Sequence, residues 1–312
     1  MAKDILLLME GPGKFFKKLA LVSMASLLLN TAETEAQTKN PGTTSITNAH
    51  VETLNDQNMP KGFQRDQIFG IVEGKEKVVA SLFYFEDGKT KTCFISNDEH
   101  PDAFSPNIDY GKIDEIAKQK GIDGVIFFAG AYKSPSGDIE GVAMENGEQV
   151  GEDSYSKWSG FVYVTPAGSL ELHRCKDQND KFDAHAAGSL TQRAKNEKGS
   201  LFQQIPAIWN GQKKLNSTSR DKFEFRAICQ TKQGKKLVLN CTEKITLDDF
   251  LEMAMDLKDE NGQPLIDDLM LEDTGVYSYG IFKDKSGKTF TMVDENYANN
   301  KIGYTNTVVI GN

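Results

Sequence analysis

Two adjacent carboxylates follow a run of apolar residues near the end of the chain. Residues 269 to 271, Leu-Met-Leu, have the character of a buried strand, and Glu272 and Asp273 come directly after them. Gly275 then allows the backbone to turn and to approach a ligand closely. Carboxylates at a strand end are common in binding and catalytic sites, but they are also common in turns, where Asp and Gly suit the backbone and charge stays outside the core. Both interpretations are open at this point.

Two other charged residues stand beside apolar segments. Arg226 alternates with phenylalanine in residues 223 to 228, Phe-Glu-Phe-Arg-Ala-Ile, which is the pattern of a strand. An arginine in such a strand more often occupies a solvated or edge position than a functional one. Glu140 comes just before Gly141 at the start of a predicted hairpin. Taken alone, neither residue establishes a site.

The motifs of several common enzyme classes are missing. The chain contains no Gly-x-Ser-x-Gly sequence and no histidine pair at metal-binding spacing, so it supports neither a serine hydrolase nor a zinc hydrolase. Residues 87 to 90 and 286 to 289 end like phosphate-binding loops, but Phe83 and Phe282 stand where the first glycine belongs. We therefore predict turns there, no metal-ligand set and no cofactor, and metal dependence stays open.

Composition sets limits on the partners. The chain has 312 residues and a formal net charge of −9, and its Lys and Arg residues form no basic stripe. A phosphate backbone needs such a stripe, so we expect no nucleic-acid binding. A small anionic substrate remains compatible with this composition, because a local cluster of cations can make its own positive pocket.

The N-terminal region has the pattern of a secretory signal. Lys14, Lys17 and Lys18 precede an apolar run at 19 to 29, and small residues ending at Ala36 suit cleavage. As a helix this run rises only about 16 Å, well short of a hydrocarbon core of about 30 Å. We therefore predict a signal peptide over 1–36, export to the periplasm or the extracellular space, and no stable membrane insertion after cleavage.

The remaining chain is predicted to hold a short tether and one folded domain. Residues 37–60 are polar and rich in Thr and Asn, which is typical of a tether, and 61–312 form the domain. Strands and helices alternate without a repeating unit, so we expect a single α+β domain of mixed or antiparallel sheets with a few packed helices. The periodicity predicts an antiparallel meander at 67–98, helices at 109–120, at 186–198 and from Thr246 onward, a buried strand at 124–132, and hairpins at 141–151, 159–174 and 223–241.

The cysteines are compatible with disulfides in an exported protein. Cys93, Cys175, Cys229 and Cys241 allow three connectivities. A tight turn at Gln233-Gly234 would place Cys229 nearly opposite Val238 and Cys241 opposite Arg226. The two sulfurs would then be on the order of 10 Å apart along the strands. We therefore expect no simple 229–241 disulfide within this hairpin.

Short motifs occurring in order resemble the phosphodiester glycosidase family. They are "GVIFFAGAY" followed by "GVAMENGEQV", then "SGFVYVTPAGSLEL", "SLFQQIPAIWNGQ", "FRAICQTKQGKKLVL" and "LEDTGVYSYGI", and together they span roughly residues 62 to 285. The chain departs from the family in two places. Phe128 stands where members usually have Asn before Ala-Gly, and Thr274-Gly275 stands where they have a double glycine. These departures put the choice of substrate in doubt.

The resemblance implies an exported hydrolase acting on a carbohydrate or sugar-phosphate, specifically a sugar 1-phosphodiester or a related envelope glycan. Arg226 would then contact the phosphate, and Asp273 would stabilise the sugar cation or activate water. Glu272 is the alternative carboxylate, and Asp273 is preferred because it stands two residues before Gly275. The substrate-binding residues implied are Gly130, Tyr132, Glu140, Gly275, Tyr277 and Ser278. Two alternatives remain, a glycan-binding protein of the same fold without turnover and a structural envelope protein whose acidic turn is only a turn.

Overall fold

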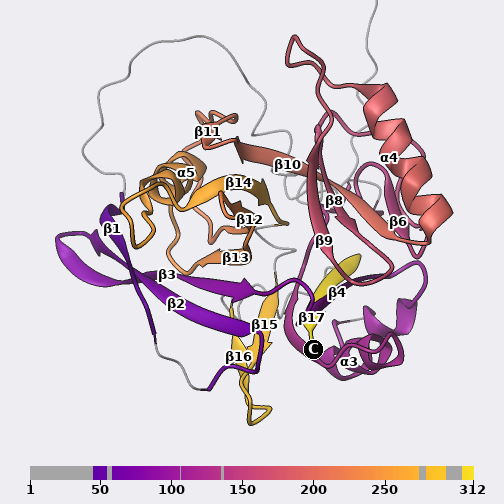
Figure 1. Cartoon of the computed structure of the whole chain (residues 1–312), viewed down its shortest axis with the longest axis horizontal. Helices are drawn as coiled ribbons and strands as arrows, with labels where there is room; N and C mark the ends of the chain where they lie inside the picture. The colour runs from indigo at the N-terminus through magenta and orange to yellow at the C-terminus, as the bar shows by residue number, and fades with distance from the viewer. Residues whose placement is uncertain (1–44, 55–57, 106, 135–136, 274–278, 293–303) are drawn as a thin grey trace, which may run out of the picture.

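Two antiparallel sheets form the body of the chain (Figure 1). The computed structural model describes residues 45–54, 58–105, 107–134, 137–273, 279–292 and 304–312. Within these residues, the larger sheet has the strand order β1-β2-β3-β13-β12-β14-β10-β6-β7, and β11, β8 and β9 extend it from β10. The smaller sheet has the order β16-β15-β5-β17-β4. The predicted single α+β domain, with antiparallel sheets and a few packed helices, is confirmed.

The bounds of the strands follow in sheet order. The larger sheet contains β1 (Thr47–Glu52), β2 (Phe63–Val72), β3 (Lys75–Phe85), β13 (Lys236–Cys241), β12 (Arg226–Thr231), β14 (Ile266–Leu271), β10 (Ser200–Trp209), β6 (Ala143–Glu145), β7 (Glu148–Gln149), β11 (Gln212–Lys213), β8 (Gly160–Val164) and β9 (Leu170–Arg174). The smaller sheet contains β16 (Thr289–Thr291), β15 (Gly280–Lys283), β5 (Gly124–Phe128), β17 (Asn306–Gly311) and β4 (Lys91–Ser96).

Three α-helices in the described part of the chain cover the outer faces of the sheets. They are α3 (Tyr110–Gln119), α4 (Ala184–Glu197) and α5 (Leu247–Asp256), and a short 3-10 helix, η1 (Pro101–Ala103), precedes α3. Figure 1 shows α5 over the β12–β14 region, α4 beside β8 and β10, and α3 beside β17. Each helix begins at a side-chain cap, because Asp109, Asp183 and Thr246 accept hydrogen bonds from N–H groups of the first turn.

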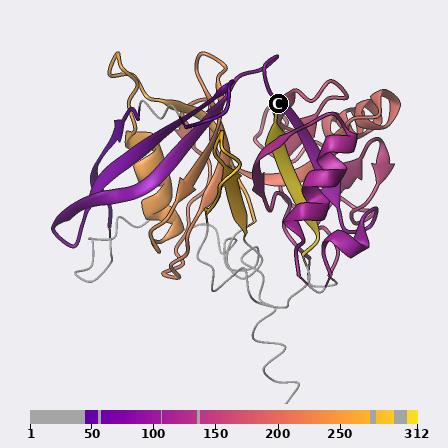
Figure 2. The same cartoon turned by 90° about the horizontal axis from the view of Figure 1, so that it is seen from below.

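Successive side chains along the strands point to opposite faces of the sheet, and this creates two main cores. Ala227 of β12 lies in the core beneath α5, whereas the next residue, Ile228, lies in the core between the two sheets. The inter-sheet core also takes Phe128 from β5 and Val308 from β17. Figure 2 shows the two halves of the molecule side by side, and β10 runs from one to the other. Its first half pairs with β8 and its second half with β14.

Two details of the strand predictions change. Strand β4 leaves the predicted meander and pairs with β17 in the smaller sheet, a long-range choice that local periodicity does not encode. Strand β1 falls inside the range predicted as a tether, because residues 47–52 pair with β2. The folded region therefore begins before residue 61, while residues 1–44, including the predicted signal, lie outside the described residues.

The cysteines are all free in this structure, and all are buried. Cys229 lies opposite Leu237 and Arg226 lies opposite Asn240, so the hairpin register differs by one residue from the prediction. Cys241 lies opposite Ala80 of β3. The prediction that Cys229 and Cys241 form no disulfide is confirmed, although the expected register is wrong.

None of the helices within the described ranges has the length and apolar character needed to cross a bilayer.

The packing of α5 on the sheet yields a test of the fold. Phe250 is fully buried and stacks on Phe225 with ring centroids 5.2 Å apart. We expect Phe250→Ala to lower the free energy of unfolding by about 3–5 kcal/mol, because it removes a large apolar side chain and leaves a cavity. Glu252→Ala, on the exposed side of the same helix, should change it by no more than about 0.5 kcal/mol. Urea denaturation measures both, and equal effects would contradict this packing.

Candidate functional site

Arg226 is the first residue of β12, and its side chain lies on the face of the strand that looks into the inter-sheet core. Its side chain is buried, so the solvated position expected from the strand pattern alone is wrong. Nη1 donates a hydrogen bond to the Tyr279 carbonyl at 2.8 Å, and Nη2 donates to the Asp273 carbonyl at 3.3 Å. The guanidinium also lies 5.4 Å from the centre of the Phe128 ring. Arg226 therefore connects the ends of strands from both sheets.

Glu272 follows β14 and has no solvent exposure. Its N–H donates to the Arg226 carbonyl at 3.0 Å, and Oε2 accepts a hydrogen bond from Gln204 Nε2 at 3.4 Å. Among the described residues, Oε1 of Glu272 has no hydrogen-bond partner. Burial raises the pKa of Glu272 well above its usual range, while the nearby charge of Arg226 opposes this shift.

Asp273 is the second carboxylate of the pair and is 4% exposed. It borders a narrow recess whose other lining residues are Ala129, Lys133, Tyr279, Tyr304, Thr305 and Asn306. Burial lowers the pKa of Lys133, and the negative charge of Asp273 opposes that shift. The recess therefore brings a carboxylate and a partly buried ammonium group near each other, in a space that is closed to ligands in this structure.

Gly130 connects these groups through its backbone. Its carbonyl accepts hydrogen bonds from the Asp273 N–H at 3.0 Å and from Gln204 Nε2 at 2.6 Å. Asn306 Oδ1 accepts from the N–H groups of Gly130 and Ala131. A Cβ at Gly130 would lie 2.6 Å from Val308 Cγ2, so the close approach that glycine permits here is to packed side chains.

Tyr132 and Glu140 lie together on the segment that follows Gly130. The Glu140 N–H donates to the Tyr132 carbonyl at 2.8 Å, and the Tyr132 ring packs against Trp158 with centroids 4.9 Å apart. Burial, reinforced by the neighbouring Glu152, raises the pKa of Glu140 to about 7. Lys157 opposes the shift. A carboxyl group that titrates near neutral pH can exchange a proton with a ligand.

The structure thus gathers Arg226, Glu272, Asp273 and Gly130 into one cluster, with Tyr132 and Glu140 on the adjoining segment. Gly275, Tyr277 and Ser278 lie outside the described residues. Sequence reasoning missed Lys133, Gln204 and Asn306. Gln204 carried a usable signal, because two consecutive glutamines stand among apolar residues in the motif "SLFQQIPAIWNGQ". Both side chains are fully buried. Asn306 carried none, since it lies far from the other residues along the chain.

Metal ligation receives no support from the described ranges, where no group of three or more His, Cys, Asp or Glu side chains is placed to hold an ion.

Comparison with known proteins gives similarity of structure alone. No protein-family model matches the chain, and no curated protein sequence matches it. A solved structure of a hypothetical protein from Synechocystis is 11% identical, with a TM-score of 0.52, over 85% of this chain and 68% of that one. The zebrafish N-acetylglucosamine-1-phosphodiester alpha-N-acetylglucosaminidase catalytic domain, auto-inhibited by its pro-peptide, is 11% identical, with a TM-score of 0.49, over 85% of this chain and 88% of that one. At this identity, the likeness to the Synechocystis protein shows the fold and carries no assignment of function.

The raised pKa of Glu140 predicts a dependence of stability on pH. Between the ordinary value of 4.5 and about 7, the folded state binds more protons than the unfolded state. The contribution of Glu140 to the stability of the folded state is therefore complete below this pH window, and it declines as the pH rises through the window. We expect Glu140→Gln, which cannot ionise, to gain a few degrees in Tm relative to wild type on going from about pH 4 to about pH 8.

Thermal melts over this pH range measure the effect. Glu115→Gln, at an exposed position of α3, reports the background effect of exchanging a glutamate. The same pH-dependent gain in both variants would contradict the assignment to Glu140.

Proposed function

We propose that the chain is an exported hydrolase acting on a sugar 1-phosphodiester or a related envelope or extracellular glycan. The observation that supports this proposal most directly is that Asp273 and Lys133 line the same narrow recess, where the charge of Asp273 acts on Lys133. The motif resemblance in the sequence provides the class of substrate, and the recess provides a carboxylate and a cation for it. In cleavage of such a substrate, the bond between the anomeric carbon and the phosphate oxygen breaks, and the oxygen keeps the electron pair.

Asp273 acts in this proposal on the sugar side of that bond. It stabilises the cationic character of the anomeric carbon or accepts a proton from the attacking water, whose oxygen forms the new bond to that carbon. A phosphate monoester is already a good leaving group, so strong acid assistance is less necessary than for an ordinary glycoside. Lys133 stabilises the negative charge that grows on the departing phosphate.

Arg226 has a different role here from direct phosphate contact. Two of its guanidinium nitrogens donate to the backbone carbonyls of Tyr279 and Asp273 within the buried cluster. We therefore assign Arg226 as a positioning residue that fixes the backbone around Asp273. Glu272, whose pKa is raised by burial, contributes as a buried carboxyl group near Arg226.

Substitutions at the two carboxylates test the mechanism. Asp273→Asn keeps the size and turn preference of the residue, so we expect turnover to fall by a factor of roughly 10² or more while Tm changes by only a few degrees. Glu272→Gln should be milder, because Asp273 and not Glu272 borders the recess. The measurement is a steady-state assay on whichever substrate the wild type cleaves in a panel of sugar 1-phosphodiesters, with products identified by mass. Full activity of Asp273→Asn would rule out this mechanism, and a large loss in Glu272→Gln alone would assign the carboxylate role to Glu272.

Substitutions of Lys133 and Arg226 distinguish direct stabilisation of the phosphate charge from positioning of the backbone around Asp273. We expect Lys133→Gln to lower turnover, and Lys195→Gln, an exposed lysine on α4, to leave it unchanged. Arg226→Lys loses the planar fork that reaches two carbonyls, so it should lower both turnover and Tm. Arg226→Lys with normal Tm and normal turnover would show that the fork is dispensable.

Glycan binding without turnover is the second candidate function. It is favoured by Phe128, which stands where family members usually have Asn and which packs against Arg226 within the cluster. Binding on a glycan array by a protein that releases no sugar would select this alternative. A protein that neither cleaves nor binds glycans would select the structural alternative, in which the acidic turn is only a turn.

Export is part of this proposal and has its own test. We expect secreted material to begin near Gln37, because small residues ending at Ala36 suit cleavage. N-terminal sequencing of exported protein measures this directly. Membrane-bound protein with an intact start at Met1 or Met9 would contradict the proposal.

A further inference from the structure

A second cavity lies on the larger sheet, and it shares no lining residue with the cluster around Asp273. Its volume is about 850 Å³, and residues of β2, β3, the β12–β13 turn and the segment after α5 line it. Small-molecule sites in proteins usually occupy roughly 300–1,000 Å³. The cavity is therefore large enough for a ligand of several rings, and neither the motifs in the sequence nor the proposed reaction uses it.

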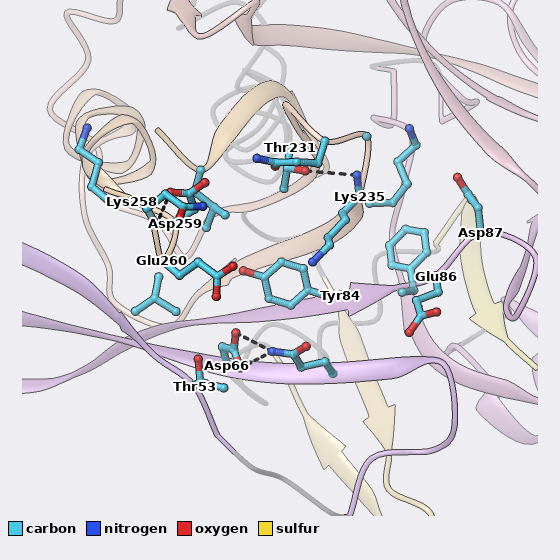
Figure 3. Close-up of a pocket in the computed structure, with 18 of the residues that line it drawn as sticks. Thr53, Asp66, Tyr84, Glu86, Asp87, Thr231, Lys235, Lys258, Asp259 and Glu260 are labelled. Atoms are coloured by element: carbon cyan, nitrogen blue, oxygen red, sulfur yellow. Dashed lines mark hydrogen bonds between the residues drawn. The ribbon is translucent and has the colours of Figure 1, made fainter. Parts of the chain in front are cut away.

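The cavity exists because α5 is shorter than the sheet that it covers. Tyr84 packs at the edge of the core beneath α5, and Ile68 belongs to the same core. Asp66 lies two residues before Ile68 on β2, so it faces the same side of the sheet. The helix ends at Asp256, and the following segment supplies Lys258, Asp259 and Glu260 to the cavity wall. Figure 3 shows Asp66 and Tyr84 on the strands, with Asp259 and Glu260 on the neighbouring segment.

The floor of the cavity carries a polar pair next to an aromatic ring. Gln64 lies directly opposite Tyr84 in the β2–β3 ladder, and Gln64 Nε2 is 3.1 Å from both carboxylate oxygens of Asp66 (Figure 3). Asp66 is only 3% exposed, and burial raises its pKa even though Gln64 opposes the shift. A carboxyl and an amide side by side offer hydrogen-bond acceptors and a donor at close spacing.

The cavity lining mixes carboxylates with lysines, and several of these groups already have hydrogen-bond or ion-pair partners. Asp66 is held by Gln64, Asp259 accepts hydrogen bonds from the N–H groups of Asn261 and Gln263, and Glu86 forms an ion pair with Lys89. Lys236, also buried, donates to Gln230. An anionic polymer would meet the carboxylates of this lining, and a polyamine would meet its lysines, Lys235, Lys236 and Lys258. A neutral ligand rich in hydroxyl groups suits this lining better, because it can both donate and accept without adding charge.

We propose that this cavity binds a short neutral saccharide. The Tyr84 ring packs against the apolar face of a sugar ring, and Asp66 with Gln64 bonds neighbouring hydroxyl groups. Lys235, at the β12–β13 turn, donates to hydroxyls at the rim. This site does not depend on hydrolysis at Asp273, because none of the residues that line it belongs to the cluster around Asp273. Its presence gives the protein a second place at which to hold a glycan.

Calorimetric titration of the full chain with maltotriose, cellotriose and chitotriose tests the proposal, with spermidine and inorganic phosphate as charged probes. We expect at least one trisaccharide to bind with a millimolar or lower Kd. Tyr84→Leu should raise the Kd of that trisaccharide by roughly tenfold or more. Asp66→Asn, which keeps the shape of the side chain, should weaken the same ligand. Glu252→Gln on α5 and Asp273→Asn should leave it unchanged.

Three outcomes would overturn the proposal. They are binding of no trisaccharide at millimolar concentration, binding of spermidine or phosphate in place of the saccharides, and loss of trisaccharide binding in Asp273→Asn with retention in Tyr84→Leu. The last result would place the saccharide in the other recess. Circular dichroism melts distinguish a lost contact from a variant that fails to fold. Should Asp66→Asn unfold, the comparison of Tyr84→Leu with Asp273→Asn still decides between the two places.

Discussion

The Arg226 guanidinium is buried between the two sheets, and the arrangement of the candidate site depends on how its charge is satisfied. Removing a guanidinium from water costs several kcal/mol unless good hydrogen bonds replace the lost hydration. Here the carbonyls of Tyr279 and Asp273 accept two of these bonds, and the face of Phe128 lies nearby. The strand ends that carry these groups are therefore held where the guanidinium needs them. Gly280 leaves room for this, since a Cβ at that position would lie 2.5 Å from Nη1.

The same requirement explains why the acidic pair is not an ordinary surface turn. Glu272 and Asp273 are both buried, and their N–H groups bond the carbonyls of Arg226 and Gly130. Gln204 then joins Gly130 to Glu272. A buried polar network of this kind is costly when it is only partly satisfied. Asp273, at the end of this network, lines the same recess as Lys133.

The second cavity arises from a different constraint, which is the mismatch between a helix and the sheet it covers. The α5 helix shields one part of the sheet and ends before the part that carries Asp66 and Tyr84. Polar residues therefore line a hollow where a longer helix would have continued the core. The two recesses differ in character accordingly. One is narrow and combines a carboxylate with an ammonium group, and the other is wide and is lined by both carboxylates and lysines.

Local patterns in the sequence determined much of the fold. The periodicity of residues 109–120, the helix start at Thr246 and the alternation in residues 223 to 228 are short-range signals, so the corresponding helices and hairpin could be predicted. The acidic pair could be singled out as well, because two carboxylates after an apolar strand are visible in the sequence. Tertiary structure alone decided that β4 pairs with β17, that Arg226 is buried, and that Lys133, Gln204 and Asn306 meet Asp273 and Gly130. These contacts join residues as far apart in the chain as Lys91 and Gly311. Pairing between distant segments depends on which faces are buried together, which local periodicity does not record.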